Sequence, residues 1–170
     1  NLFVDKNQKI VSQKGKIREM NIDYFASKTA VDPDIPVAVL VDRGSASASE
    51  IVTGSMQELD RGVIVGQRSY GKGLVQQTYN LSYNTLLKVT IAKYYTPSGR
   101  CIQALDYTHR NSEGSVYKVP DSLITEFKTK NGRSVFDGSG IFPDVYTDPD
   151  YYSNLAMSLF VNYLFFDYAN

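Results

Sequence analysis

The sequence predicts one α/β domain, because two short apolar runs flank an amphipathic segment that carries a helix start signal. The chain has 170 residues, which suits a single globular domain better than two independent cores. Residues 37–41 (VAVLV) and 62–66 (GVIVG) are mostly β-branched and are bounded by Pro, Gly and charged residues. A strand, a helix and a second strand in this order form a βαβ unit with parallel strands.

The first part of the chain, residues 1–34, is polar and holds short β-like stretches. Residues 9–11 and 16–18 flank Gly15, where we expect a turn. The five apolar residues at 37–41 then predict a strand that is buried on both faces, as in parallel sheets covered by helices.

The segment after this strand carries the clearest helix start in the chain. Ser47 and Glu50 have the spacing of a capping box. The helix should end before Arg61 and Gly62, where the second strand begins. Its apolar face is predicted to contain Ile51, Val52, Met56 and Leu59.

Beyond residue 73 the apolar pattern changes to a period of two. Residues 75–81 and 86–95 predict an antiparallel β-hairpin. Residues 106–114 are polar and are expected to form a loop. Residues 124–128 and 134–136 are short apolar stretches on either side of a turn at Asn131-Gly132.

A C-terminal helix is predicted to start near Pro149 and Asp150, because proline is favoured in the first turn of a helix. Its apolar face would contain Leu155, Leu159, Phe160, Tyr163 and Leu164. The complete prediction is therefore an α/β core with a βαβ unit, an antiparallel β-hairpin and a C-terminal helix.

Composition excludes several classes of protein. Hydrophobic residues make up 42% and charged residues 21%, which argues against wholesale disorder. Lys and Arg total 18, as do Asp and Glu, and this zero net charge argues against a partner that is nucleic acid or an anionic membrane. The single cysteine, Cys101, and the single histidine, His109, argue against a disulfide and a zinc site, so we expect no metal or other cofactor.

Ser47 is the first candidate for chemistry, because it lies where a strand turns into a helix. Backbone N–H groups are unpaired at a helix N-terminus and its dipole is positive, so an oxyanion formed at Ser47 would be stabilised. The alternative is that Ser45 and Ser47 only cap the helix, and spacing alone favours that alternative.

Lys72 is the second candidate, since Gly71 and Gly73 let the backbone turn sharply around it. A solvated lysine in a surface turn is the commoner explanation of such a triplet. Residues 66–72 also fit the phosphate-binding pattern G-x-x-x-x-G-K. However, Gly73 replaces the magnesium-binding Ser or Thr of that pattern, and a strand pattern follows instead of a helix.

Two other serine-enzyme patterns fit poorly. Residues 69–72 match S-x-x-K, but the glycines disfavour the helix that this motif requires, and S-D-N and K-T-G are both absent. A Ser-His-Asp triad would have to use His109, which lies in a polar stretch. If Ser47 is a nucleophile, lysine is therefore the more plausible base.

Taken in order, these motifs resemble the carboxy-terminal processing peptidases, also called tail-specific proteases. The resemblance extends from about residue 36 to residue 145. It depends on several separate runs: residues 44–52 (GSASASEIV), 63–66 (VIVG), 70–76 (YGKGLVQ), 88–100 (KVTIAKYYTPSGR) and 140–144 (GIFPD).

The resemblance implies a role for each matching position. Ser47 matches the nucleophile and Lys72, 25 residues later, matches the general base. Gln76 matches the residue that holds the lysine amine, and the backbone N–H of Ala48 matches one oxyanion donor. A lysine acts as a base only when burial lowers its pKa from about 10.4 to roughly 7–8.

The family also implies a core related to the crotonase and Clp-type protease folds. The expected function is a serine endopeptidase with a Ser-Lys dyad and an acyl-enzyme intermediate, acting on protein or peptide substrates through their C-terminal segments. The expected location is the bacterial cell envelope, periplasmic or secreted, and a homo-oligomer is left open.

Two family features are not recognisable in the sequence: the upstream glycine-rich loop that supplies a second oxyanion donor, and a PDZ domain. Residues 1–5 also read like the interior of a protein, so we expect residues 1–170 to be a single partial catalytic domain. Two alternative functions stay open at this point: a P-loop-like nucleotide binder, and a noncatalytic interaction module on the protease fold.

Overall fold

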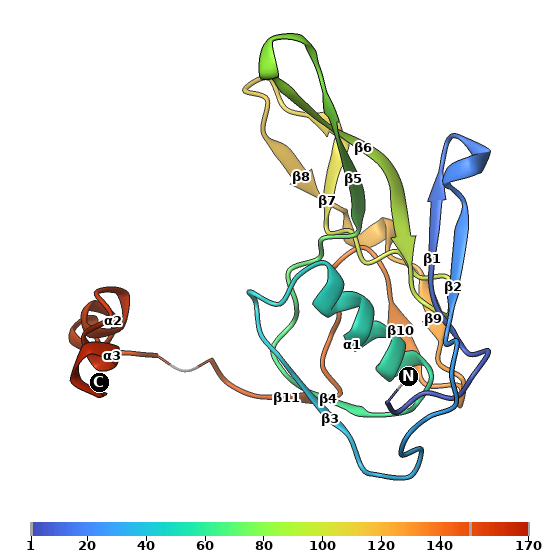
Figure 1. The fold of residues 1–170 in the computed structure, drawn as a ribbon, viewed down its shortest axis with the longest axis horizontal. Helices are drawn as coiled ribbons and strands as arrows, with labels where there is room; N and C mark the ends of the chain where they lie inside the picture. Colours follow the sequence, from blue (N-terminus) through green and yellow to red (C-terminus); the bar gives the residue numbers. More distant parts are fainter. Residues whose placement is uncertain (1, 150, 170) are drawn as a thin grey trace.

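The computed structural model describes residues 2–149 and 151–169, and Figure 1 shows their arrangement. The strands are β1 Lys9–Gly15, β2 Ile22–Phe25, β3 Ala38–Val41, β4 Val63–Gly66, β5 Leu74–Asn80, β6 Leu86–Tyr95, β7 Leu105–Arg110, β8 Val116–Lys118, β9 Glu126–Lys128, β10 Ser134–Phe136 and β11 Val145–Tyr146. The helices are α1 Ala48–Glu58, α2 Asn154–Val161 and α3 Leu164–Ala169. Short 3₁₀ turns lie at Arg18–Met20, Ser82–Asn84 and Asp121–Leu123.

The predicted βαβ unit is confirmed. β3 and β4 pair in parallel, with Val39 opposite Ile64, and β11 adds a third parallel strand beside β4. In Figure 1, α1 lies against this small sheet. Val41, Met56 and Ile64 form the buried cluster between them.

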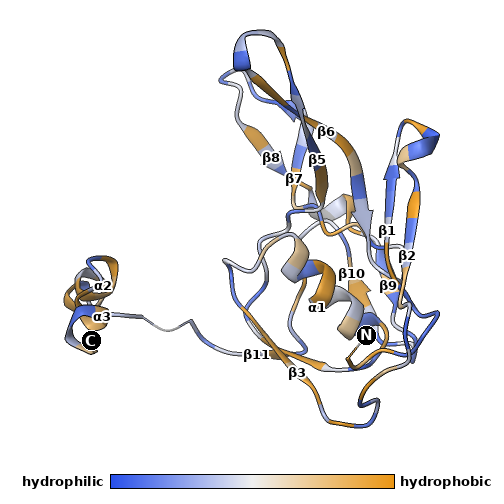
Figure 2. Ribbon diagram, in the orientation of Figure 1, coloured by the Kyte–Doolittle hydropathy of each residue, from blue (hydrophilic) through white to orange (hydrophobic). Residues whose placement is uncertain are grey.

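The prediction that residues 37–41 are buried on both faces is wrong. Successive side chains of a strand point to opposite faces, and α1 covers only one face of the sheet. On the other face Leu40 is 79% exposed, and Val63 and Val145 are about half exposed. Figure 2 shows the hydrophobic colour along β3, and the exposure of Leu40, Val63 and Val145 makes this face apolar and largely uncovered among the described residues.

The helix prediction needs one correction. Val52, placed on the apolar face by its spacing, is 57% exposed. Residues 53–58 are instead buried all round, polar side chains included. Other segments of the chain surround the second half of α1, and a hydroxyl there shows one such contact: Ser55 Oγ donates to Ile10 O of β1 at 2.7 Å.

The second sheet has the order β2-β1-β6-β5, and the predicted β5–β6 hairpin is confirmed. The turn expected at Gly15 is wrong, because Gly15 is the last residue of β1 and pairs with Ala92 of β6. A Cβ atom on Gly15 would lie 2.5 Å from Ile91 O, so this glycine permits close strand packing and not a turn.

The loop expected at residues 106–114 is confirmed only for residues 111–114, because residues 106–110 belong to β7. β7 and β8 pair as an antiparallel hairpin. Asn111 closes its turn, because Asn111 N–H donates to Ser115 O at 3.0 Å. Most side chains of β7 are polar and exposed, so the strand lacks the apolar alternation from which a hydropathy pattern predicts strands. The strand pair around Asn131-Gly132 is present as β9 and β10.

The C-terminal helix is divided into two. Asn162 ends α2 and Tyr163 has a φ of 58°, which a continuous helix does not allow. Ser153 caps α2 by accepting Ala156 N–H, so the helix starts later than expected; Asp150, part of the predicted start, lies outside the described residues. Within the described ranges, no helix is both long and apolar enough to cross a bilayer.

Candidate functional site

Ser47 lies immediately before α1 in an unusual backbone conformation. Its φ is 59° and its ψ is −116°, a region that residues with a side chain rarely adopt. Such a conformation costs on the order of 1–3 kcal/mol and persists only when the surrounding structure enforces it. Two hydrogen bonds enforce it here: Ser47 N–H donates to Glu50 Oε2 at 2.9 Å, and Glu50 N–H donates to Ser47 O at 2.9 Å.

Lys72 lies in the loop between β4 and β5, and its side chain is exposed while Gly71 and Gly73 are buried. Residues 103–104 pack directly against this loop. Ala104 N–H donates to Gly71 O at 3.0 Å, and Gly73 N–H donates to Gln103 Oε1 at 2.8 Å. A Cβ atom on Gly71, whose φ is 88°, would lie 2.4 Å from the Ala104 Cβ, so the loop requires glycine there.

Glu50 joins the two segments and is fully buried. Its Oε2 accepts the N–H groups of both Ser47 and Lys72, at 2.9 and 2.8 Å. Its Oε1 accepts Gly71 N–H at 2.6 Å and the Ser69 hydroxyl at 2.5 Å. One carboxylate oxygen therefore bridges the backbones of the two candidate residues, which lie 25 positions apart in the sequence.

The sequence indicated Glu50 only as half of a helix cap. That half is present, because the Glu50 carboxylate does accept Ser47 N–H. The other three donors come from residues 69–72, and the residues near Glu50 in the sequence do not predict them.

The structure brings together the backbones of Ser47 and Lys72 but not their reacting atoms. Among the described residues, no hydrogen bond joins Ser47 Oγ to Lys72 Nζ, and none joins Gln76 to Lys72. Gln76 lies on β5 next to a register shift, opposite Thr90, and is exposed. The N–H of Ala48 donates no hydrogen bond within the described part of the chain and is thus available to an acceptor.

The loop at residues 66–73 does not have the structure of a phosphate-binding loop. Strand β5 follows it, so the loop does not lead into a helix as a phosphate-binding loop does. The N–H groups of Gly71 and Lys72, which would hold a phosphate, already donate to the Glu50 carboxylate. This occupied position argues against the nucleotide-binding alternative.

His109 lies on the exposed strand β7 and has a local partner. Its Nδ1 is 2.6 Å from Asp106 Oδ2, and this hydrogen bond holds the pKa of the Asp106 carboxyl well below its usual range. No hydrogen bond connects His109 to Ser47 in the described ranges. The only histidine of the chain therefore belongs to a surface hairpin and not to a catalytic triad.

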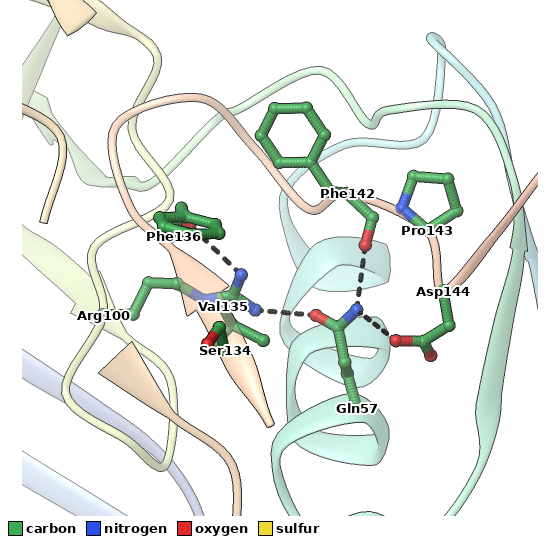
Figure 3. A pocket seen from close by; sticks show the side chains of 8 residues that line it. All are labelled: Gln57, Arg100, Ser134, Val135, Phe136, Phe142, Pro143 and Asp144. Carbon is green, nitrogen blue, oxygen red and sulfur yellow. Dashed lines mark hydrogen bonds between the residues drawn. The ribbon is translucent and has the colours of Figure 1, made fainter. Parts of the chain in front are cut away.

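Two hollows of the described structure differ in their distance from the site. One, of about 420 Å³, is at the far end of α1, on the order of 15 Å from Ser47 at 1.5 Å per residue. Figure 3 shows that Gln57 in this pocket is hydrogen bonded to Arg100, Phe142 and Asp144, so these polar groups already have partners. The other, of about 1070 Å³, is a mostly apolar groove between β5, β6 and β7.

The larger groove is the one beside the candidate residues. Leu74 and Gln103 line it, and they adjoin Gly73 in sequence and through the Gln103 hydrogen bond. Tyr94 N–H donates to Gly73 O at 2.8 Å, which extends the β5–β6 pairing towards Lys72. No group of three or more His, Cys, Asp or Glu side chains arranged for a metal ion occurs among the described residues.

Comparison with known proteins connects this site to one family. The sequence model of peptidase family S41 matches residues 1–110. A probable CtpA-like serine protease of Staphylococcus saprophyticus is 41% identical over 110 residues, which are 64% of this chain and 22% of that protein. A carboxy-terminal-processing protease of Bartonella bacilliformis is 42% identical over 106 residues, which are 62% of this chain and 24% of that protein.

One solved structure has a similar fold along most of the chain. The photosystem II D1 C-terminal processing protease superposes with a TM-score of 0.60 and 29% identity, covering 88% of this chain and 29% of that one. The chain thus spans about a quarter of the length of the proteins it matches.

Proposed function

The chain belongs to peptidase family S41, and from this premise we propose that it is a partial catalytic domain of a serine endopeptidase that cleaves proteins near their carboxyl termini. The relatives named above are serine or carboxy-terminal processing proteases, which supports this reaction class. We propose as well that β3, α1 and β4 are part of a core of the crotonase or Clp type.

The observation that carries the proposal is the conformation of Ser47 together with its link to Lys72. A helix cap needs no backbone strain, whereas a nucleophile on a sharp strand-to-helix turn is commonly held in this way. The shared Glu50 oxygen keeps the lysine loop at the same helix end. Strain at Ser47 and this tether to Lys72 together favour catalysis over capping.

In the proposed reaction, Ser47 Oγ attacks the carbonyl carbon of the scissile peptide bond. The neutral amine of Lys72 takes the hydroxyl proton and then gives it to the leaving amine as the C–N bond breaks. The free N–H of Ala48 stabilises the oxyanion at the positive end of α1. Water then hydrolyses the acyl-enzyme with Lys72 as base, and Gln76 orients the amine without adding a charge.

A lysine amine is ordinarily protonated at neutral pH, and the proposed base must be neutral and sheltered from water. Lys72 is exposed in this chain, so the proposal requires the rest of the polypeptide, the substrate, or both to cover it. The groove beside Leu74 offers room for an extended peptide next to Lys72. We further propose protein or peptide substrates and a location in the bacterial cell envelope.

The test is peptide cleavage by the full-length polypeptide that carries this chain. Ser47→Ala and Lys72→Met should each lower kcat by more than about 10³-fold. Ser49→Ala and Lys88→Met are the matched controls, because both side chains are exposed and neither belongs to the proposed machinery. Lys72→Arg should also be inactive, since an arginine cannot lose its proton.

Retained cleavage in Ser47→Ala or in Lys72→Arg would refute the dyad. A fluorophosphonate probe should label Ser47 in the full-length protein and should not label Ser47→Ala. Failure to label Ser47 in a folded full-length protein would indicate the remaining alternative, a noncatalytic interaction module on the protease fold.

A further inference from the structure

Ser69, three residues before Lys72, is a buried hydroxyl that no step of the proposed reaction uses. It is 4% exposed, and its Oγ donates to Glu50 Oε1 at 2.5 Å. The same oxygen accepts Ile141 N–H at 2.7 Å, and Ser69 N–H donates to Ile141 O at 3.0 Å. Ser69 is therefore bonded to Glu50 on one side and to the segment between β10 and β11 on the other.

This second segment approaches the lysine loop very closely. Gly140 has a φ of 77°, and a Cβ atom on it would lie 2.7 Å from Ser69 O and 2.9 Å from Ser69 Oγ. Gly140 N–H donates to Ile102 O at 2.9 Å, so the turn is also tied to the segment between β6 and β7 that contains Gln103. The loop of Lys72 thus lies between two segments, and the Ser69 hydroxyl joins one of them to Glu50.

The orientation of the Glu50 carboxylate depends on these bonds. Its Oε2 can accept both Ser47 N–H and Lys72 N–H only if Oε1 points towards Gly71 and Ser69. The hydroxyl of Ser69 supplies one of the two bonds that hold Oε1 there. Without it, Oε1 keeps only Gly71 N–H, and the buried Ile141 N–H loses its side-chain acceptor.

We propose that Ser69 is a positioning residue of the peptidase reaction, a role that rests on the proposed function. Through Glu50 it holds the backbones of Ser47 and Lys72 in their relative position, and through Ile141 it anchors that arrangement to the segment before β11. Ser69 does not touch the substrate or the transferred proton in this proposal. Its loss should therefore slow the chemical step and leave substrate binding unchanged.

The test is the kinetics of Ser69→Ala in the full-length protein. Because misplacement of reacting groups by about 1 Å costs on the order of 10²-fold, kcat should fall by about 10²-fold while KM stays within about twofold. Labelling of Ser47 by a fluorophosphonate should slow by the same factor as kcat. Ser69→Thr keeps the hydroxyl and should restore most of the activity.

The matched control is Ser55→Ala. Ser55 is as buried as Ser69, and its hydroxyl donates to the backbone oxygen of Ile10 in another segment, whereas that of Ser69 donates to the Glu50 carboxylate. Ser55 lies on the second half of α1, away from the proposed dyad. Ser55→Ala should lower the melting temperature and leave kcat unchanged. This control separates general destabilisation from loss of positioning.

Each outcome is decisive. The positioning role is overturned if Ser69→Ala keeps kcat within about twofold of wild type, or if Ser55→Ala loses as much kcat as Ser69→Ala. Ser69→Ala could prove too unstable to assay, and Ser69→Thr then decides. If Ser69→Thr folds like the wild type but its kcat is about 10²-fold lower, the positioning role is also overturned. Ser47→Ala with full activity would instead refute the proposed function itself, so the two failures are distinguishable.

Discussion

Replacing Glu50 by glutamine keeps the size of the side chain but changes what its two end atoms can accept. The native carboxylate accepts four donors, two on each oxygen. A glutamine amide has one accepting oxygen and one NH₂ group that only donates. At least one backbone N–H will therefore face another donor inside a fully buried site.

The magnitude follows from which oxygen is replaced. The smallest loss arises if the NH₂ group takes the place of Oε1, because the Ser69 hydroxyl can turn and accept from it, and Gly71 N–H alone loses its acceptor. If the NH₂ group takes the place of Oε2, Ser47 N–H and Lys72 N–H both lose theirs. A hydrogen bond to a charged group contributes about 1.5–3 kcal/mol, so one or two lost bonds cost about 1.5–6 kcal/mol.

This loss is expected in both stability and catalysis. Each 1.36 kcal/mol raised on the barrier slows the reaction tenfold, so a loss of about 3 kcal/mol that reaches the dyad lowers kcat roughly 10²-fold. The assay is kcat for peptide cleavage by the full-length protein, beside the free energy of unfolding from urea denaturation. Glu113→Gln is the control, because Glu113 is exposed on the β7–β8 turn.

Wild-type kcat together with wild-type stability in Glu50→Gln would contradict both roles of the carboxylate. A fall in stability without a fall in kcat would contradict the positioning role alone. That result would show that the carboxylate stabilises the fold without positioning the two residues.

Three further outcomes are expected. Burial is the largest single influence on the Asp60 carboxyl and would raise its pKa, but the hydrogen bonds from Arg133, Asn131 and Thr129 and the charge of Arg133 together outweigh it, so the pKa is lowered. This contribution to stability is present at neutral pH and is lost as pH falls below about 4, so urea denaturation between pH 7 and pH 2 should show a smaller acid loss in Asp60→Asn. Gly71→Ala should lower the melting temperature and abolish cleavage, because its Cβ would overlap Ala104; wild-type behaviour would contradict the close packing. Burial raises the pKa of the Cys101 thiol, so iodoacetamide should alkylate the native protein more slowly at pH 8 than the urea-unfolded protein, and equal rates would disprove the burial.

Features that depend on residues close together in the chain were predictable from the sequence. The strand, helix and strand at β3, α1 and β4 follow from their apolar patterns and from the pairing of Ser47 with Glu50 as a helix cap. The sharp turn expected around Lys72 is represented only by the positive φ of Gly71, since the structure assigns no turn or bend to residues 70–73. The resemblance to the carboxy-terminal processing peptidases was carried by these same short runs, and the family is the one that the comparisons show.

Features that depend on long-range packing were not predictable. Strand β7 is polar, and one face of β3, which includes Leu40, is apolar but exposed. In both cases distant segments of the chain determine what surrounds the side chains. The division of the C-terminal helix at Tyr163 depends on one backbone angle that hydropathy does not encode. The strained backbone of Ser47 is likewise visible only in three dimensions.

The sequence by itself determined the local elements around Ser47 and Lys72 and made these two residues candidates for chemistry, because capping and periodicity act over a few residues. The tertiary structure alone decided that Glu50 receives donors from both Ser47 and a loop more than 20 residues away. A buried carboxylate must be satisfied by some set of N–H and O–H groups, but any exposed backbone could supply them. The path of the chain decides which donors reach the carboxylate of Glu50. In this fold they include the N–H groups of Ser47 and Lys72, so the backbones of these two residues lie side by side.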